Sequence, residues 1–204
     1  MGIGSPNAPP ILFVPPLFEE LNRTRALIAA IMRGVASKGY GCWLLDLPGT
    51  GESERPLARL SWDQWRSAVR AAAKQVGHGS PLAGVASIRG GCLLDDVAPA
   101  RCAWRFAPVA GASLLRDLNR AGLAAGGGTA GYELAPNMAG PLDMAEPHPM
   151  DMLRVVRLES DRGEGDLKIE GPALWRRSEP ESSVALAASL SDDIANWVGR
   201  CAAS

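Results

Sequence analysis

A regular alternation of short apolar runs with longer segments of helical periodicity constrains the fold more than any other feature of this chain. Residues 11–14 are wholly apolar and are closed by Pro15 and Pro16. An unbroken apolar run of this length is typical of a parallel strand that is buried on both faces of a sheet. The expected strands are residues 11–14, 41–47, 81–88, 102–109, 152–159 and 166–170.

Amphipathic segments separate these strands, and Ser61 is expected to cap one of them. The expected helices are residues 19–37, 62–76, 92–97, 112–125 and 186–198. Residues 126–150 are rich in Gly, Pro and Met and are expected to form a loop or a reduced cap. The alternation predicts one α/β domain over residues 1–204, with a mostly parallel central sheet and helices on both faces.

Composition excludes several classes of function. The 204 residues include 21 Lys and Arg against 22 Asp and Glu, so no electrostatic footprint for nucleic acid or an anionic membrane is present. No apolar run reaches the length of a membrane span, and the start lacks the basic region of a secretory signal. The four cysteines are scattered, which predicts reduced thiols in a cytoplasmic protein and neither a metal site nor a cofactor.

The working site of such a sheet lies at the carboxyl ends of its strands. The segment from Asp46 to Ser53 follows an expected strand and reads D-x-x-G-x-G-x-S, like the loop after a central strand in α/β hydrolases. Its glycines suit a tight turn with unusual backbone angles, and a generic glycine-rich turn is the plainer interpretation. A phosphate-binding loop is disfavoured because the G-x-x-x-x-G-K-[ST] pattern is absent.

The place of the nucleophile elbow comes about 40 residues later, at the sequence Ser-Ile-Arg-Gly-Gly of residues 87–91. Ser87 and Gly91 occupy the two small positions, and Arg89 occupies the position of the nucleophile. Arginine is always charged and cannot attack an acyl group. Arg89 is expected either to be a fixed cation over the crevice, for a carboxylate or phosphate, or to pair with Glu19 or Glu20.

Two displaced nucleophiles are candidates. Ser87 lies two residues early, and on a strand its hydroxyl group would share a face with Arg89. Cys92 lies in the first turn of the expected helix, where the helix dipole could lower the pKa of a thiol. A packing role is the plainer interpretation of both.

The remaining parts of a Ser-His-Asp relay are incomplete. An acid could come from Asp161, Glu164 or Asp166, after the fifth expected strand. The base should follow the last strand, but residues 171–179 contain no histidine. His148 precedes the late strands, and His78 lies between two glycines in an expected turn.

The segment of residues 14–25 occupies the loop that normally supplies an oxyanion-hole amide, and it gathers charged and polar side chains at a helix start. Acidic residues there favour the helix dipole, which is the plainer interpretation. They would also open onto the crevice of Arg89, and a buried Glu–Arg pair is expected. The candidate ligand-binding residues are Glu19, Glu20, Asn22, Arg25, Asp46 and Arg89.

Six segments together resemble one family. They are PPLFEELNRTR (15–25), DLPGTGES (46–53), SIRGGCLL (87–94), APVAGASLLRDL (107–118), AGYELAP (130–136) and GPALWRRSEPE (171–181). The chain thereby resembles the exosortase A system-associated hydrolase 2 family of the α/β-hydrolase superfamily, as a short member. The resemblance implies an α/β-hydrolase fold, an arginine at the elbow matching Arg89, and a context of bacterial exopolysaccharide production and sorting of PEP-CTERM proteins.

Two functions remain open on the sequence. One is a hydrolase of acyl esters or thioesters, or an acyltransferase, with a non-standard site that uses Ser87 or Cys92. The other is a catalytically degenerate domain whose crevice around Arg89 binds an acyl or carboxylate ligand or a protein partner. A third, weaker interpretation is a structural subunit of a homo-oligomer.

Overall fold

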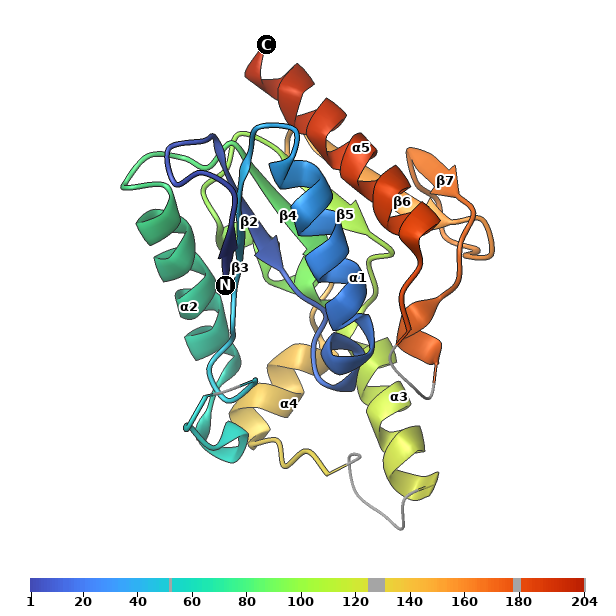
Figure 1. Cartoon of the computed structure of the whole chain (residues 1–204). Coiled ribbons are helices and arrows are strands. Elements are labelled where there is room, and N and C mark those ends of the chain that lie inside the picture. The colour runs from blue at the N-terminus through green and yellow to red at the C-terminus, as the bar shows by residue number, and fades with distance from the viewer. Residues whose placement is uncertain (52, 125–130, 178–180, 204) are drawn as a thin grey trace.

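A seven-stranded sheet forms the centre of the molecule (Figure 1). The computed structural model describes residues 1–51, 53–124, 131–177 and 181–203. The strand order is β1-β3-β2-β4-β5-β6-β7, and every neighbouring pair is parallel except β1 with β3. The strands are β1 (Gly2–Ile3), β2 (Pro10–Val14), β3 (Gly41–Leu44), β4 (Gly84–Ile88), β5 (Ala103–Phe106), β6 (Leu153–Leu158) and β7 (Leu167–Ile169). The predicted α/β class with a mostly parallel sheet is confirmed.

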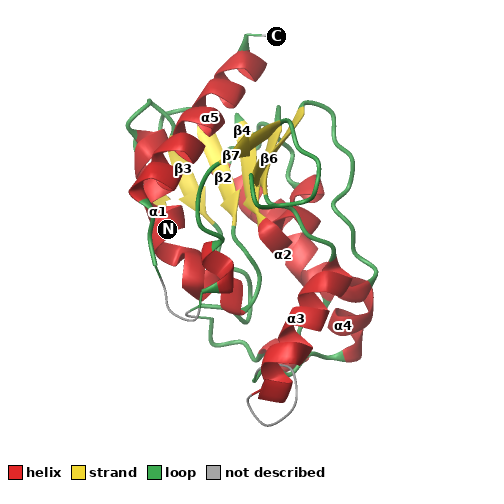
Figure 2. Cartoon of the chain, turned by 90° about the vertical axis from the view of Figure 1, so that its right-hand side faces the viewer, coloured by secondary structure: helices red, strands yellow, loops and turns green. Residues whose placement is uncertain are grey.

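Helices cover both faces of the sheet, as predicted. The helices α1 (Glu19–Ala36) and α5 (Val184–Ala202) lie on one face, and α2 (Trp62–Val76) lies on the other (Figure 2). The helices α3 (Gly111–Ala124) and α4 (Pro136–Asp143) lie beyond the carboxyl ends of the strands (Figure 1).

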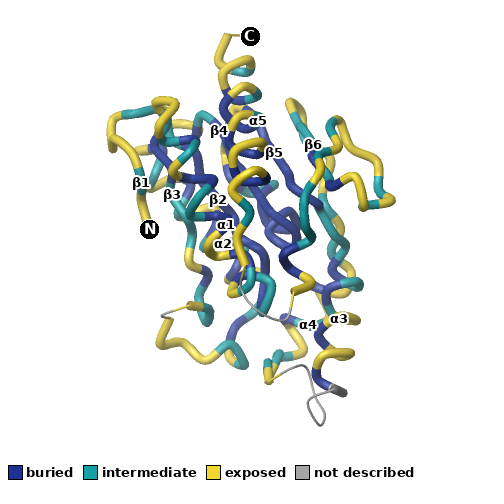
Figure 3. Tube along the Cα trace, turned by 45° about the vertical axis from the view of Figure 1, so that its right-hand side comes forward, coloured by how far each residue is buried: buried dark blue, intermediate teal, exposed yellow. Residues whose placement is uncertain are grey.

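Alternation along β2 explains the two layers. Ile11 and Phe13 pack against α1 and α5, whereas Leu12 and Val14 pack toward α2. Successive side chains of a strand point to opposite faces, so an apolar run must be covered on both sides. The central strands are accordingly buried along their length (Figure 3).

The prediction of a helix over residues 92–97 is wrong. Two short 3₁₀ turns take its place, η2 (Arg89–Leu93) and η3 (Asp95–Val97). Glycine disfavours a helix, and only seven residues separate Gly91 from Pro99, so short turns are favoured there over an α-helix. In contrast, α2 begins as predicted, because Ser61 and Gln64 form a reciprocal capping box.

The region expected to be a loop or reduced cap is partly ordered as α4. Residues 126–130 lie outside the described part of the chain, but residues 131–150 lie within it. Met138 and Leu142 of α4 are fully buried, and a Cβ atom on Gly111 would lie 1.7 Å from the carbonyl oxygen of Leu142. The start of α3 and the end of α4 therefore pack backbone against backbone. None of the helices in the described ranges is both long and apolar enough to cross a bilayer.

Candidate functional site

The chain turns sharply after β4, and Arg89 lies at the apex of the turn. Its φ is 53°, in the left-handed region that side chains larger than glycine rarely adopt. A Cβ atom on Gly91 would lie 2.4 Å from the carbonyl oxygen of Val14, so only glycine fits there. This is the backbone of a nucleophile elbow, with an arginine where the nucleophile would stand.

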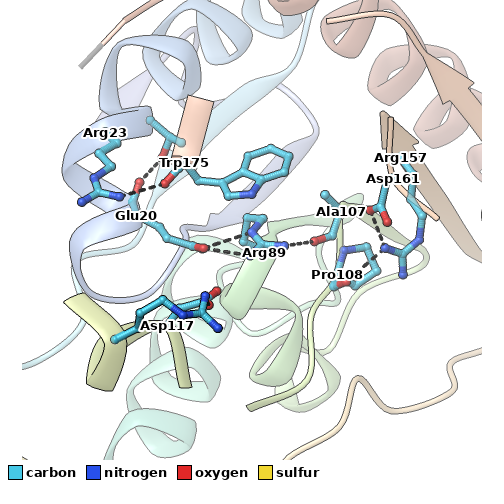
Figure 4. A network of polar contacts seen from close by, with 11 residues as sticks. Glu20, Arg23, Arg89, Ala107, Pro108, Asp117, Arg157, Asp161 and Trp175 are labelled. Carbon is cyan, nitrogen blue, oxygen red and sulfur yellow. Dashed lines mark hydrogen bonds and ion pairs between the residues drawn. The ribbon is translucent and has the colours of Figure 1, made fainter. Parts of the chain in front are cut away.

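Arg89 forms a buried ion pair with Glu20, which follows β2 (Figure 4). Arg89 Nη2 lies 2.8 Å from Glu20 Oε1, and Arg89 Nε lies 3.2 Å from each carboxylate oxygen. The side chains are only 9% and 14% exposed. Burial raises the pKa of the Glu20 carboxyl group, and the charge and hydrogen bonds of Arg89 only partly oppose this. The sequence allowed two roles for Arg89, a fixed cation for a ligand or a partner of Glu19 or Glu20. The structure contains the ion pair with Glu20.

Two further groups fix the guanidinium group of Arg89. Arg89 Nη1 donates to the carbonyl oxygen of Ala107, after β5, at 3.3 Å. The ring of Trp175 lies over the guanidinium group, with 4.7 Å from Arg89 Cζ to the ring centroid. Trp175 belongs to the turn η4 (Leu174–Arg176), which follows β7, and its carbonyl oxygen accepts from Arg23 Nη1 at 3.1 Å.

Unusual backbone angles gather at this crevice. Phe18, after β2, has a φ of 58°, and Ala107 has a φ of 48°. Together with Arg89, they place three non-glycine residues in left-handed conformations at the ends of adjacent strands. Such conformations persist where the surrounding structure enforces them, and they concentrate at binding and active sites.

Among the three acids expected after β6, Asp161 lies at the crevice. Arg157 Nη1 donates to Asp161 at 2.7 Å, and the backbone N–H of Gly163 donates at 3.0 Å. Burial alone would raise the pKa of Asp161, but these hydrogen bonds and the arginine charges outweigh it and lower the pKa. The side chain of Asp166 instead accepts from the backbone of Val155 in β6.

Neither histidine lies at the crevice. His78 is exposed in the turn after α2, with a φ of 49°. His148 is exposed and lines a separate depression with Trp62 and Arg66. The position after β7, where a relay would need its base, holds Trp175.

Ser87 and Cys92 are both buried beneath the elbow. The Ser87 hydroxyl group donates to Asp95, which also accepts from Arg105 Nε at 2.8 Å and from Arg105 Nη2 at 2.7 Å. Ser87 and Asp95 have no exposed surface, and Cys92 is 1% exposed. Burial raises the pKa of the Cys92 thiol to about 12, so the lowering expected from a helix dipole is wrong. The α-helix that would supply that dipole is also absent from this described segment.

The remaining sequence candidates are divided between the crevice and other surfaces. Glu19 lines the crevice and accepts from Tyr132 at 3.3 Å, and Asn22 donates to Glu19 at 3.4 Å. Arg25 is exposed, and it is not among the described residues that line the crevice. Asp46 lines a separate depression with Ser53, although Gly49 and Gly51 of its loop adopt the positive φ angles expected of them.

Two adjoining cavities flank the Arg89–Glu20 pair. The first, called the α1–α3 cavity, has about 630 Å³ and is lined by Leu17, Phe18, Glu19, Glu20, Arg23, Leu114, Asp117, Leu118, Arg120, Ala121, Trp175 and Arg176. The second, called the arginine cavity, has about 320 Å³ and is lined by Arg89, Pro108, Val109, Ser113, Arg116, Asp117, Arg157, Leu158, Ser160, Asp161, Ala173, Trp175 and Arg176. Sequence reasoning missed Arg116, Arg157, Trp175 and Arg176 as lining residues. Trp175 and Arg176 follow the last expected strand, and that place was the signal for them, whereas Arg157 lies within β6 and Arg116 within α3, where no sequence signal pointed to the crevice.

Comparisons with solved structures identify the architecture. Est1E from Butyrivibrio proteoclasticus, a structure with bound ferulic acid, matches 100% of this chain and 95% of its own at 12% identity, with a TM-score of 0.63. An extracellular α/β-hydrolase from a Paenibacillus species matches 94% of this chain and 98% of its own at 9% identity, with a TM-score of 0.58. This chain has the α/β-hydrolase fold.

Proteins with the α/β-hydrolase fold do not share one reaction. The bottromycin epimerase BotH, in complex with bottromycin A2, matches 98% of this chain and 93% of its own at 14% identity, with a TM-score of 0.55. No protein-family model matches the sequence, and no curated protein matches it. The α/β-hydrolase fold is thus shown, and the chemistry must be argued from the crevice.

Proposed function

We propose that this α/β-hydrolase-fold protein binds a small organic anion, an acyl or carboxylate ligand, and does not hydrolyse it. The observation that carries the proposal is the occupant of the elbow. Arg89 stands at the position of the nucleophile and is held there by Glu20, Ala107 and Trp175. A guanidinium group cannot attack a carbonyl carbon, but it binds carboxylates well.

The hydrogen bonds of Arg89 leave room for a ligand. A guanidinium group has five N–H donors. Bonds to Glu20 and Ala107 engage Nε and one N–H on each terminal nitrogen, so one N–H on each terminal nitrogen remains. Arg89 lines the arginine cavity, where four arginines face two aspartates, and one arginine charge remains in excess when Glu20 is counted against Arg89. The positive excess favours an anionic ligand.

Hydrolysis or acyl transfer is the alternative, and it would need Ser87 or Cys92. Three features oppose it: the Ser87 hydroxyl group is buried and bonded to Asp95, burial raises the pKa of the Cys92 thiol to about 12, and neither histidine lines the crevice. The resemblance to the exosortase A system-associated hydrolase 2 family would connect the ligand with exopolysaccharide production. That connection stays a prediction.

The test is equilibrium binding of carboxylates by calorimetry. Replacing Arg89 alone would leave Glu20 buried without its partner, so the informative variant is Glu20→Gln/Arg89→Gln, which removes both charges. We expect the double variant to stay folded by circular dichroism and to bind octanoate at least about tenfold more weakly than the wild type. The matched control is Arg70→Gln, an exposed arginine on α2, which should bind as the wild type does.

Two results would contradict the proposal. One is wild-type affinity in the Glu20→Gln/Arg89→Gln variant. The other is steady turnover of an octanoate ester by the wild type, because turnover requires a nucleophile that the proposal denies.

A further inference from the structure

We infer that the ligand is an amphipathic acid bound across both cavities, with its apolar tail in the α1–α3 cavity and its acidic head in the arginine cavity between Arg116 and Arg176. The inference rests on the proposed function, since it requires that the crevice binds an anion. The inference goes beyond the proposed function by assigning each part of the ligand to a cavity and by naming two residues that bind its acidic head.

The α1–α3 cavity suits a hydrocarbon tail. Its volume of about 630 Å³ is in the range of sites for small organic ligands. Leu17 and Phe18 line it from the loop after β2, and Leu114 and Leu118 line it from α3. All four are buried at 7% exposure or less, so the protein itself holds this apolar wall in place.

The charges of the α1–α3 cavity are balanced, unlike those of the arginine cavity. Three acids, Glu19, Glu20 and Asp117, face three arginines there. In the arginine cavity, four arginines face two acids, and when Glu20, the ion-pair partner of Arg89, is counted as well, one arginine charge remains in excess. An anionic head is therefore favoured in the arginine cavity, and this fixes the direction of the ligand.

Besides Arg89, two arginines of the arginine cavity have hydrogen-bond donors free for a ligand, and these are Arg116 and Arg176. Arg157 is engaged by Asp161 and by the carbonyl oxygens of Glu164 and Pro108. Among the residues that the structure describes, Arg116 bonds only to the Ser113 hydroxyl group, at 2.8 Å. The Arg176 side chain has no hydrogen bond or ion pair with the residues that the structure describes. These two side chains come from different elements, α3 and η4, and both are exposed, so they can close on a carboxylate or phosphate head.

The two cavities meet at a common wall. Asp117, Trp175 and Arg176 line both of them. Trp175 is 5% exposed and lies against Arg89, and its indole N–H is buried with no acceptor among the described residues (Figure 4). A ligand that passes this wall would place its head near Arg89 and its tail along α3.

The experiment compares four probes by calorimetry: octanoate, octyl phosphate, acetate and 1-octanol. Octanoate and octyl phosphate carry head and tail, acetate carries the head alone, and 1-octanol carries a tail without charge. We expect at least one of the first two to bind at least about tenfold more tightly than acetate and 1-octanol. The comparison of octanoate with octyl phosphate identifies the preferred head.

Variants then separate the two cavities. The double variant Arg116→Ala/Arg176→Ala should bind the amphipathic acid at least about tenfold more weakly than the wild type and should bind 1-octanol with unchanged affinity. Ala121→Trp adds bulk to the α1–α3 cavity. It should weaken binding of the amphipathic acid until its affinity equals that of acetate. Arg70→Ala on α2 is the matched control and should change neither.

The outcomes distinguish this inference from the proposed function. If none of the three acids binds the wild type, the proposed function itself fails. If octanoate binds but is no tighter than acetate, or if Arg116→Ala/Arg176→Ala binds it as the wild type does, the two-cavity arrangement is overturned while anion binding stands.

Discussion

At the scale of single residues, two buried ion pairs lie at the elbow that follows β4. Arg89 faces the crevice and pairs with Glu20, whereas Asp95 lies beneath the elbow and pairs with Arg105. The second pair is the more deeply buried, with side chains 3% and 0% exposed. The Ser87 hydroxyl group completes it. A buried pair of this kind fixes geometry, and removal of one partner leaves an uncompensated charge.

Asp95→Asn should therefore lower the free energy of unfolding by about 3–5 kcal/mol, because Arg105 would remain charged and buried. The adjacent Asp96→Asn is the control. Asp96 pairs with Arg66 at 2.7 Å, but the side chains are 19% and 24% exposed, so water screens the charges. We expect a loss of about 1 kcal/mol or less there. Urea unfolding followed by circular dichroism measures both. A loss of about 1 kcal/mol or less in Asp95→Asn as well would mean that the Asp95 network does not stabilise the elbow.

At the scale of elements, the C-terminal helix is fixed to the sheet by polar contacts as well as by apolar packing. Asp193 of α5 accepts from Trp104 Nε1 of β5 at 2.8 Å and pairs with Arg154 of β6 at 2.7 Å. Burial alone would raise the pKa of Asp193, but the hydrogen bonds from Arg154 and Trp104 outweigh it and hold the pKa below its ordinary value of 3.8. One carboxylate thus joins α5 to two strands.

The Asp193 contacts predict a pH-dependent contribution to stability. Because the pKa is lower in the folded protein, the folded state releases the proton more readily, and the stabilisation is present above pH 3.8 and lost as the pH falls through the folded pKa. Asp193→Asn should lower the free energy of unfolding by about 2 kcal/mol at pH 7, and this difference from the wild type should shrink below pH 3.8. Asp192→Asn, at an exposed pair with Lys38, should change stability little at either pH. A difference for Asp193→Asn that is constant with pH would contradict the role of its charge.

Elements with a strong local signal could be predicted from the sequence. The apolar run of residues 11–14 and the Ser61 cap depend on neighbouring residues only, and both are found as predicted. The helix α4 was missed because Pro136 and Pro141 mask it: Pro136 suits the first turn of a helix, and burial of Met138 and Leu142 stabilises the rest. That burial depends on α2 and α3, which local sequence cannot reveal.

At the scale of the whole molecule, the crevice is built from the ends of five strands that are distant in sequence. Glu20 follows β2, Arg89 follows β4, Ala107 follows β5, Asp161 follows β6 and Trp175 follows β7. The sequence could predict that Arg89 pairs with Glu19 or Glu20, because these residues follow strands that were expected to be parallel, but it could not choose between the two acids. It could not predict that Trp175 covers Arg89, because that depends on the path of the loop after β7.

The most direct test of the central claim, that the elbow holds an ion-paired arginine and no activated nucleophile, is intact-protein mass spectrometry after treatment with a broad fluorophosphonate. An activated serine at an elbow would be labelled covalently, whereas the buried Ser87 hydroxyl group should not react. We predict no adduct on the folded protein. A single adduct that maps to Ser87 would contradict the account and restore the hydrolase interpretation.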